Sequence, residues 1–376
     1  MRIYLDNAAT TRVTEAVFEA MKPYFCEIYG NPASEHGFGR DARRAVDAAR
    51  AQVAQALGAQ AGEIYFTASG TEADNWAIRC AGKGHVITSV IEHHAVLHSC
   101  RRLEEAGVEV TYLPVDADGL VSPEALRAAM RPETSLVSVM LANNEIGAVQ
   151  PVAELAAIAH AGGALFHTDA VQAVGMVPID VEAMGIDMLS LSGHKFHAPK
   201  GVGALYLRRG VRLGRLMEGG AQERGMRPGT ENLASIVGLG KAIALATEDV
   251  PARAGGMLVL REHLIKRLLE ENPGAALNGH PVKRVSGNVN VRFEGVDART
   301  LLLRLDLMGI AASAGSACTS GATEPSHVLT AIGLTPEQAG STLRLSLSDE
   351  TTLSEVDAAA DAIRDILADM GGRRNA

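Results

Sequence analysis

Residues 190–203 read Ser-Leu-Ser-Gly-His-Lys-Phe-His-Ala-Pro-Lys-Gly-Val-Gly, and the interpretation of the chain starts from this stretch. It follows an apolar run beginning at Ile186, which indicates a buried strand, and it ends in turn-forming residues around Pro199. Lys195 is therefore expected where the chain leaves a sheet, partly shielded from water. Because desolvation lowers the pKa of a lysine, its amine is a candidate Schiff-base nucleophile. The alternative is that Lys195 and Lys200 are ordinary surface charges.

Length and composition indicate a soluble enzyme. The chain has 376 residues, enough for a large core and two domains, and it is 47% hydrophobic and 21% charged. Its net charge of −9 includes no basic block, so no nucleic-acid partner is expected. No apolar run reaches the ~18 residues that span a bilayer, and the N-terminus lacks a signal-peptide core. We therefore expect no membrane association and a cytoplasmic location.

Strand and helix patterns alternate between residues 64 and 207. This alternation predicts an α/β fold with a mostly parallel sheet, helices on both faces and ligands at the carboxyl ends of the strands. The predicted strands are Ile64–Thr67, His85–Ser89, Glu109–Leu113, Leu136–Leu141, Ala164–Thr168, Met188–Ser192 and Val202–Leu207.

The C-terminal third has a different pattern. Residues from about 235 to 272 are helical in pattern, and we expect Gly255-Gly256 to interrupt them at a domain boundary. Short strands at Asn288–Phe293 and Thr342–Leu347 then predict a smaller α+β domain. The expected division is a large domain over residues 13–255 and a small domain formed by residues 1–12 with 256–376.

One predicted strand runs into Ser69-Gly70-Thr71-Glu72, and a helix follows. Ser69 and Glu72 have capping-box spacing, and Gly70 permits close approach of a ligand to the backbone. Such a helix N-terminus binds phosphate well, although a plain capped helix has the same pattern.

Polar residues follow two other strands. His93 can stack on a flat aromatic ligand and exchange protons near neutral pH, or it is a hydrogen-bonded structural histidine. Asp169 can hold a protonated pyridine nitrogen, with Gln172 one helical turn later on the same side. Alternatively, Asp169 is a helix N-cap.

Three later segments add further candidates. The glycine-rich loop 219–232 carries two arginines and offers amides and a hydroxyl to a phosphate, or it is a surface loop. Cys318 lies among small residues and is expected to be accessible, whereas the commoner fate of cysteine is burial. The four cysteines form no Cys-x-x-Cys pair, so neither a zinc site nor a disulfide framework is expected. Arg344 alternates with apolar residues and suits a bidentate grip on a carboxylate, unless it faces solvent at a sheet edge.

Together these segments resemble class V, fold-type I pyridoxal-phosphate enzymes of the NifS/IscS cysteine desulfurase family. They follow the order found in the family over nearly the whole chain, and the residues that follow Gly193 favour the NifS-like branch. The matching motifs are Tyr-Leu-Asp-Asn-Ala-Ala-Thr-Thr (4–11), Gly-Asn-Pro-Ala-Ser (30–34), Thr-Ala-Ser-Gly-Thr-Glu-Ala-Asp-Asn (67–75), Glu-His-His-Ala-Val-Leu (92–97), Asn-Asn-Glu-Ile-Gly (143–147), Asp-Ala-Val-Gln (169–172), Ser-Gly-His-Lys (192–195), Ser-Ala-Cys-Thr-Ser (316–320) and Leu-Arg-Leu-Ser-Leu (343–347).

The resemblance implies a fold-type I transferase fold, with a large domain around a seven-stranded sheet and a small domain carrying a mobile cysteine loop. It also implies a role for each site residue. Lys195 would carry pyridoxal 5′-phosphate as a Schiff base, and Cys318 would be the nucleophile. Gly70, Thr71, Ser192 and His194 would bind the phosphate, together with Thr230 from the partner of a homodimer. His93 would stack on the ring, Asp169 would bind the pyridine nitrogen, and Asn144 and Gln172 would lie on the ring-oxygen side. Arg344 and Asn144 would bind the substrate.

The implied reaction converts L-cysteine to L-alanine. Lys195 would remove the α-proton, and the sulfur would pass to Cys318 as a persulfide for a sulfur-acceptor scaffold protein in iron–sulfur cluster assembly. No resident metal is expected, and transient contact of Cys318 with an iron–sulfur cluster is left open. The alternatives are a selenocysteine lyase, another fold-type I aminotransferase or a non-catalytic sulfur carrier. A nicotinamide dehydrogenase is disfavoured because no Gly-x-Gly-x-x-Gly follows the first long strand.

Overall fold

The computed structural model of the chain describes residues 2–315 and 325–372. Its largest sheet has seven strands in the order β2-β8-β7-β6-β5-β3-β4. β8 is antiparallel to both its neighbours and the other pairs are parallel, so the predicted mostly parallel sheet is confirmed. The strands are β2 (Ile64–Thr67), β3 (His85–Ser89), β4 (Glu109–Leu113), β5 (Thr134–Ser138), β6 (Leu165–Asp169), β7 (Met188–Ser192) and β8 (Gly203–Leu207).

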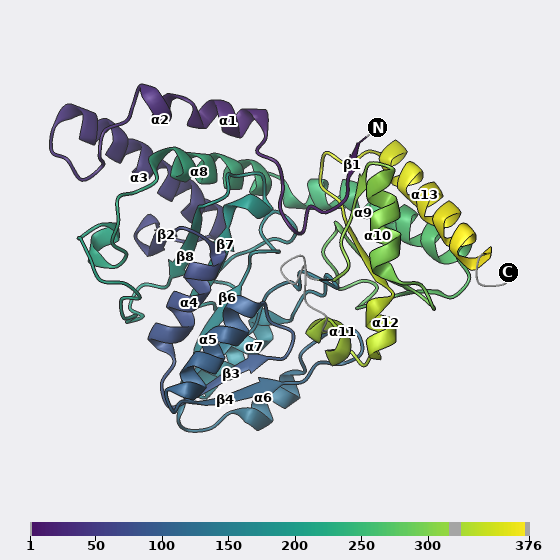
Figure 1. Cartoon of the computed structure of the whole chain (residues 1–376). Coiled ribbons are helices and arrows are strands. Elements are labelled where there is room, and N and C mark those ends of the chain that lie inside the picture. Colours follow the sequence, from purple (N-terminus) through teal and green to yellow (C-terminus); the bar gives the residue numbers. More distant parts are fainter. Residues whose placement is uncertain (1, 316–324, 373–376) are drawn as a thin grey trace.

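Helices cover both faces of this sheet (Figure 1). Successive strand residues point to opposite faces, and in β5 Leu136 belongs to the apolar cluster that includes α4 and α5, while Val137 belongs to the cluster that includes α3, α6, α7 and α8. α3 ends at Gly58, whose φ of +69° forms a left-handed cap. The helices of this part are α1 (Glu15–Met21), α2 (Pro23–Cys26), α3 (Gly37–Leu57), α4 (Gly70–Ala81), α5 (His94–Glu105), α6 (Pro123–Ala129), α7 (Val152–Ala161) and α8 (Leu233–Thr247), with short 3-10 turns η1 (Ala61–Glu63), η2 (Gly193–Lys195) and η3 (Glu223–Gly225).

The C-terminal part has its own sheets and apolar cluster, beside the large sheet in Figure 1. A three-stranded antiparallel sheet has the order β12-β10-β9, and β1 pairs in parallel with β11 through Ile3 and Ile310. Within the described residues, no helix is both long and apolar enough to cross a membrane. The elements are β1 (Ile3–Tyr4), α9 (Val250–Glu271), β9 (Ala275–Leu277), β10 (Asn288–Phe293), α10 (Ala298–Leu307), β11 (Ile310–Ala311), α11 (His327–Ala331), α12 (Pro336–Gly340), β12 (Thr342–Ser346) and α13 (Leu353–Gly372).

The glycine pair Gly255-Gly256 lies inside α9 and does not interrupt a helix, contrary to expectation. The break falls instead between α8 and α9, where the Asp249 side chain accepts a hydrogen bond from the Ala252 amide at 3.0 Å. A methyl group added at either glycine would meet no atom within 4 Å. A capped helix start therefore decides where the two helices separate, and the glycines do not.

The N-terminal segment brings the two parts together at the strand ends. It leaves β1, and the Thr11 amide donates to the His194 carbonyl at 2.8 Å, just after β7. The Asn7 side chain donates to the Ser346 carbonyl at 2.8 Å, at the end of β12. Residues from β7, β12 and the N-terminus consequently face one space.

Candidate active site

A cavity of about 780 Å³ lies at the carboxyl ends of β6 and β7, beside the N-terminus of α4. Among the described residues, it collects all the predicted cofactor and substrate residues except Thr230. The lining residues are Ala8, Ala9, Ser69, Gly70, Thr71, Asp74, His93, Met140, Asn144, Asp169, Val171, Gln172, Ser192, His194, Lys195 and Arg344.

The α4 N-terminus forms a confined cradle at one end of this cavity. The Ser69 hydroxyl accepts the Glu72 amide at 3.1 Å, which caps the helix as predicted. The Glu72 carboxylate does not complete the capping box, because it accepts from the Ala68 amide and from Arg227. A methyl group at Gly70 would lie 2.7 Å from the Val171 side chain and 3.2 Å from Ser192. The helix therefore presents first-turn amides to a space that only glycine leaves open.

Arg227 and Arg224 of the glycine-rich loop bind other parts of their own chain. Arg227 pairs with Glu72 at 2.8 Å, and Arg224 donates to the Ile64 carbonyl at 2.7 Å. Thr230 is exposed and does not line the cavity. Within one described chain, Thr230 is therefore not part of the predicted phosphate site.

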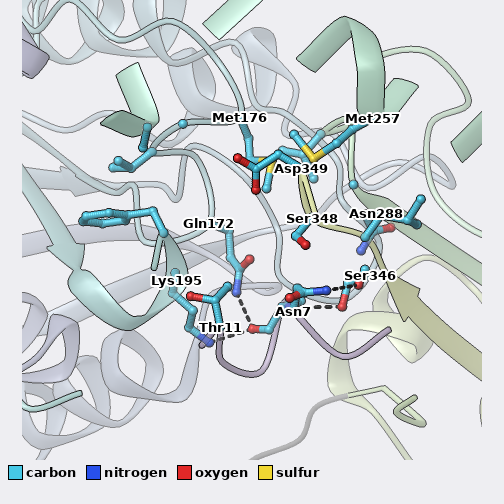
Figure 2. Close-up of a pocket in the computed structure, with 18 of the residues that line it drawn as sticks. Asn7, Thr11, Gln172, Met176, Lys195, Met257, Asn288, Ser346, Ser348 and Asp349 are labelled. Atoms are coloured by element: carbon cyan, nitrogen blue, oxygen red, sulfur yellow. Dashed lines mark hydrogen bonds between the residues drawn. The ribbon is translucent and has the colours of Figure 1, made fainter. Parts of the chain in front are cut away.

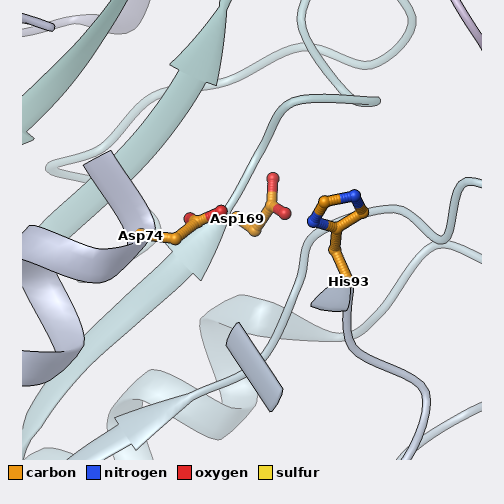
Figure 3. Close-up of side chains that lie close together, drawn as sticks. All are labelled: Asp74, His93 and Asp169. Carbon is orange, nitrogen blue, oxygen red and sulfur yellow. The ribbon is translucent and has the colours of Figure 1, made fainter. Parts of the chain in front are cut away.

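Two buried carboxyl groups and an imidazole stand close together in the cavity, with Asp169 between Asp74 and His93 (Figure 3). Their ligand atoms lie within 4.8 Å of one another. Burial raises the pKa of Asp169 to about 6, against the lowering effects of the Val171 amide and Lys195. Burial, followed by the charge of Asp169, raises the pKa of Asp74 well above its usual range. Asp169 is therefore the ionised member at neutral pH, and a protonated Asp74 is a poor metal ligand.

His93 is neutral around pH 7, so the expected proton exchange near neutral pH is wrong. Burial, together with the charge of Lys195, lowers its pKa to about 4. Its Nδ1 accepts the Ala95 amide at 3.1 Å at the start of α5, so Nε2 carries the proton. A neutral aromatic face toward the cavity remains suited to stacking.

Lys195 lies in η2, immediately after β7, and is half-buried. Its Nζ donates to the carbonyls of Ala8 at 2.6 Å and Ala9 at 2.8 Å. The surface-charge alternative is therefore wrong for Lys195 and correct for Lys200, which is exposed. Next to it, burial and then Lys195 lower the pKa of His194 to about 4, leaving a neutral ring 3.1 Å from the Thr10 hydroxyl.

Arg344 is buried in β12 with 1% exposure, which excludes the solvent-facing alternative. Its guanidinium donates to the Asn144 carbonyl and to the Asp6 carboxylate, both at 2.9 Å. Its Nε is buried and has no hydrogen-bond partner in the described part of the chain. An inward-facing guanidinium with an unused donor fits a carboxylate ligand.

Cys318 lies outside the described residues, but the residues on either side of that gap lie near the cavity. The Ser313 amide donates to the Arg344 carbonyl at 3.0 Å, and the Ser326 hydroxyl donates to the buried Glu145 carboxyl at 2.5 Å. Burial raises the pKa of Cys100 to about 12, so that thiol is a weak nucleophile.

The sequence did not single out Asp6, the Ala8 and Ala9 carbonyls or Asp74, although each stood in a quoted motif. Asp74 lies four residues after Gly70 on the same helix, so helical spacing places both on one face. The N-terminal groups had no such local signal, because they meet Lys195 and Arg344 only in the folded chain.

These residues fit pyridoxal phosphate. The α4 amides, Thr71, Ser192 and His194 would hold an anion in the cradle that a methyl group at Gly70 would fill. Asp169 offers a buried negative charge, His93 a neutral ring, and Lys195 a half-buried amine. Fold and site together define an α/β protein built to bind a phosphorylated aromatic cofactor through a lysine.

Comparisons with known proteins agree with this class. The aminotransferase class-V family model matches residues 3–359, and the chain belongs to this family. It is 53% identical over 372 residues to the cysteine desulfurase IscS of Methanosarcina thermophila, covering 97% of this chain and 92% of that one. A cysteine desulfurase of Gluconacetobacter diazotrophicus is 48% identical over 375 residues, covering 98% and 94%.

Solved structures of NifS-like and related proteins superpose on nearly the whole of this chain. A NifS-like protein superposes with a TM-score of 0.93 at 38% identity, covering 98% of this chain and 100% of that one. A structure of SspA in complex with cysteine has a TM-score of 0.83 at 39% identity, covering 94% and 100%. The expected fold-type I architecture is confirmed.

Proposed function

We propose that this chain is a pyridoxal-phosphate-dependent cysteine desulfurase. It converts L-cysteine to L-alanine and transfers the sulfur to Cys318 as a persulfide, for use in iron–sulfur cluster assembly. The observation that carries the proposal is the single cavity in which the Lys195 amine, the Asp169 carboxylate and the Arg344 guanidinium converge. The cysteine desulfurases and the cysteine-bound SspA that resemble the chain support the choice of substrate.

The chain's own residues divide the chemical work. The bound cofactor supplies an electron sink for the carbanion formed at the substrate α-carbon. Arg344 holds the substrate carboxylate, and the Lys195 amine takes the α-proton. The buried Asp169 carboxylate would keep a proton at the ring nitrogen of the cofactor. The Cys318 thiolate would attack the substrate sulfur, so that the sulfur–sulfur bond forms as the carbon–sulfur bond breaks and leaves its electron pair on the β-carbon. The proton lost by the Cys318 thiol would go to the β-carbon, and the proton taken by Lys195 would return to the α-carbon to complete alanine.

We further propose a cytoplasmic homodimer with two domains in each subunit, residues 13–255 and residues 1–12 with 256–376. The separate apolar cluster around α9, α10 and α13, which includes Ile3 and Leu5, supports this division. The exposed Thr230 supports a dimer in which it reaches the partner's phosphate site. A sulfur-acceptor scaffold protein would receive the persulfide sulfur.

The test is alanine and sulfide production from L-cysteine with added reductant, on protein loaded with pyridoxal phosphate. Equal amounts of both, lost in Lys195→Ala and Cys318→Ala, are expected. A Cys318→Ser variant that released alanine at the normal rate would remove Cys318 from the scheme. A loaded protein that makes no alanine would contradict the proposal and direct assays to selenocysteine and to amino-group transfer.

A further inference from the structure

His197 lies two residues after Lys195 and has a backbone conformation that few side chains adopt. Its φ is +69°, in the left-handed region, and the residue is 8% exposed. A non-glycine residue keeps such a conformation only where its surroundings hold it in place, and such positions cluster at functional sites. The contacts of His197 are therefore informative.

Three contacts hold this residue. Its amide donates to the Thr11 hydroxyl at 2.8 Å, its Nδ1 lies 3.0 Å from the Arg12 carbonyl, and its Nε2 lies 3.2 Å from the Asp349 carboxylate. A carbonyl oxygen only accepts, so Nδ1 must carry a proton. The Asp349 carboxylate lies at ion-pair distance from Nε2, which favours a proton there too. The two contacts together favour the imidazolium form.

The charged groups around His197 join four segments of the chain. Asp349, which follows β12, also binds Arg253 of α9 at 2.7 Å. Its neighbour Glu350 binds Arg12 of the N-terminal segment through both oxygens, at 2.5 and 2.7 Å. The loop carrying Lys195 is thus tied by ionic contacts to the end of the strand carrying Arg344.

A second pocket lies beside this tie. It is found between the Lys195 loop and the end of β12, and it shares Gln172 and Lys195 with the first cavity (Figure 2). Its walls include His197, Arg253 and Asp349. The ionic group thus lies at the wall of a pocket that the Lys195 side chain also lines, close to the amine that it would position.

We propose that His197 is a positioning residue, whose imidazolium bridges Asp349 and the Arg12 carbonyl and so sets Lys195 against Arg344. This inference rests on the proposed function, because it assumes that both residues act on one amino-acid substrate. Burial opposes the charged form, but Asp349, the Arg12 carbonyl and Glu350 outweigh it, so the pKa of His197 is raised. The facing charges are Asp349, Glu350, Arg253 and Arg12.

The experiment compares His197→Asn, Asp349→Asn, the double variant and His263→Asn in full-length, cofactor-loaded protein. Asn tolerates the left-handed conformation but carries no charge. His263 is a matched control, because this α9 residue pairs with Asp357 of α13 at 2.7 Å and lines neither cavity. The measurements are kcat and KM for L-cysteine against pH, the absorbance-monitored Kd for L-alanine, and the thermal midpoint.

His197→Asn and Asp349→Asn should each lower kcat or weaken alanine binding about tenfold or more. The double variant should lose no more activity or alanine affinity than the more impaired single variant, because each of the three variants removes the same bridge. The wild-type profile should show an ionisation above the ordinary histidine range that His197→Asn lacks, and His263→Asn should match the wild type.

If the His197→Asn variant kept the kcat, the Kd for L-alanine and the pH profile of the wild type, the inference would be overturned. So would changes no larger than those of His263→Asn, or a fall in thermal midpoint with unchanged kinetics per folded site. Failure of the proposed function gives a different result, namely no alanine from the wild type. In that case alanine binding by the same variants still decides the role of His197.

Discussion

The Arg344 guanidinium lies 2.9 Å from the Asp6 carboxylate, and 338 positions of sequence separate the two residues. This internal carboxylate accepts from one terminal nitrogen of the guanidinium, while Nε is buried and has no partner among residues 2–315 and 325–372. A substrate carboxylate entering the cavity would use that free donor and share or displace the Asp6 contact. The strength of substrate binding should therefore depend on the planar shape of the guanidinium as well as on its charge.

Arg344→Lys should raise KM for L-cysteine about tenfold or more, because lysine keeps the charge but cannot form the two parallel hydrogen bonds. Steady-state kinetics on cofactor-loaded protein measure this effect. Arg292→Lys is the control, since Arg292 lies on the neighbouring strand β10 and binds Asn278 instead. An unchanged KM in Arg344→Lys would remove Arg344 from substrate binding.

Glu92 should make the protein less stable as the pH rises. Burial raises its pKa to about 8, against the hydrogen bonds from Ser89 and the Met140 amide. Between the unfolded pKa near 4.5 and the folded value, only the folded state keeps the proton. Stability due to Glu92 is therefore greatest below pH 4.5 and falls by about 1.4 kcal/mol per unit up to pH 8.

Urea unfolding of the wild type and Glu92→Gln between pH 5 and 8 measures this slope. The uncharged amide should flatten it, whereas Glu105→Gln, at an exposed position at the end of the following helix α5, should retain it. Parallel pH curves for Glu92→Gln and the wild type would show that Glu92 ionises normally in the folded protein.

The sequence predicted six of the seven strands of the large sheet to within one residue at each end. The exception is the strand predicted at 136–141, where β5 covers Thr134–Ser138 and the Met140 amide beyond it donates to Glu92. A buried carboxyl distant in sequence therefore changed the strand end. The glycine pair was misjudged for another reason, because the Asp249 cap separates the helices.

Prediction of the site succeeded where a residue's role follows from its place at a strand or helix end. Gly70, Asp169 and Lys195 are of this kind. Asp6 was missed because its contact with Arg344 exists only after the N-terminal segment crosses the strand ends. The pKa of His93 was misjudged because its burial beside Lys195 is a property of the fold.

Gly70→Ala should weaken cofactor binding about tenfold, although alanine is the better helix former. The added methyl group would lie 2.7 Å from Val171 and 3.2 Å from Ser192, within the cradle. Cofactor retained after dialysis, measured by absorbance, checks this prediction. Gly62→Ala is the control, since its methyl group would meet nothing within 4 Å. Equal retention in both variants would show that the cradle has room for a methyl group.

Gly256→Ala should stabilise the protein by about 0.5–1 kcal/mol, because Gly256 lies within α9 and a methyl group there meets no atom. Urea unfolding gives the change. Gly58→Ala should act in the opposite direction, since Gly58 has a φ of +69° at the end of α3. Destabilisation by Gly256→Ala would indicate that α9 bends or is covered at that position.

Glu223→Ala should destabilise the protein by about 3–5 kcal/mol, because it leaves the Arg50 cation buried without its partner. Glu223 accepts two hydrogen bonds from Arg50 at 2.7 Å and one from the Phe66 amide at 3.1 Å, and both charged side chains are almost fully buried. This pair anchors the glycine-rich loop to α3 and β2.

Urea unfolding of Glu223→Ala and Glu105→Ala separates a buried ion pair from an exposed one. Glu105 pairs with Arg102 at 2.7 Å on the surface of α5, and its loss should cost less than about 1 kcal/mol. If Glu223→Ala costs no more than Glu105→Ala, the loop is held by its other contacts, chief among them the Arg227–Glu72 pair. A large loss that Glu223→Gln partly restores would instead assign the anchor to the hydrogen bonds as well as to the charge.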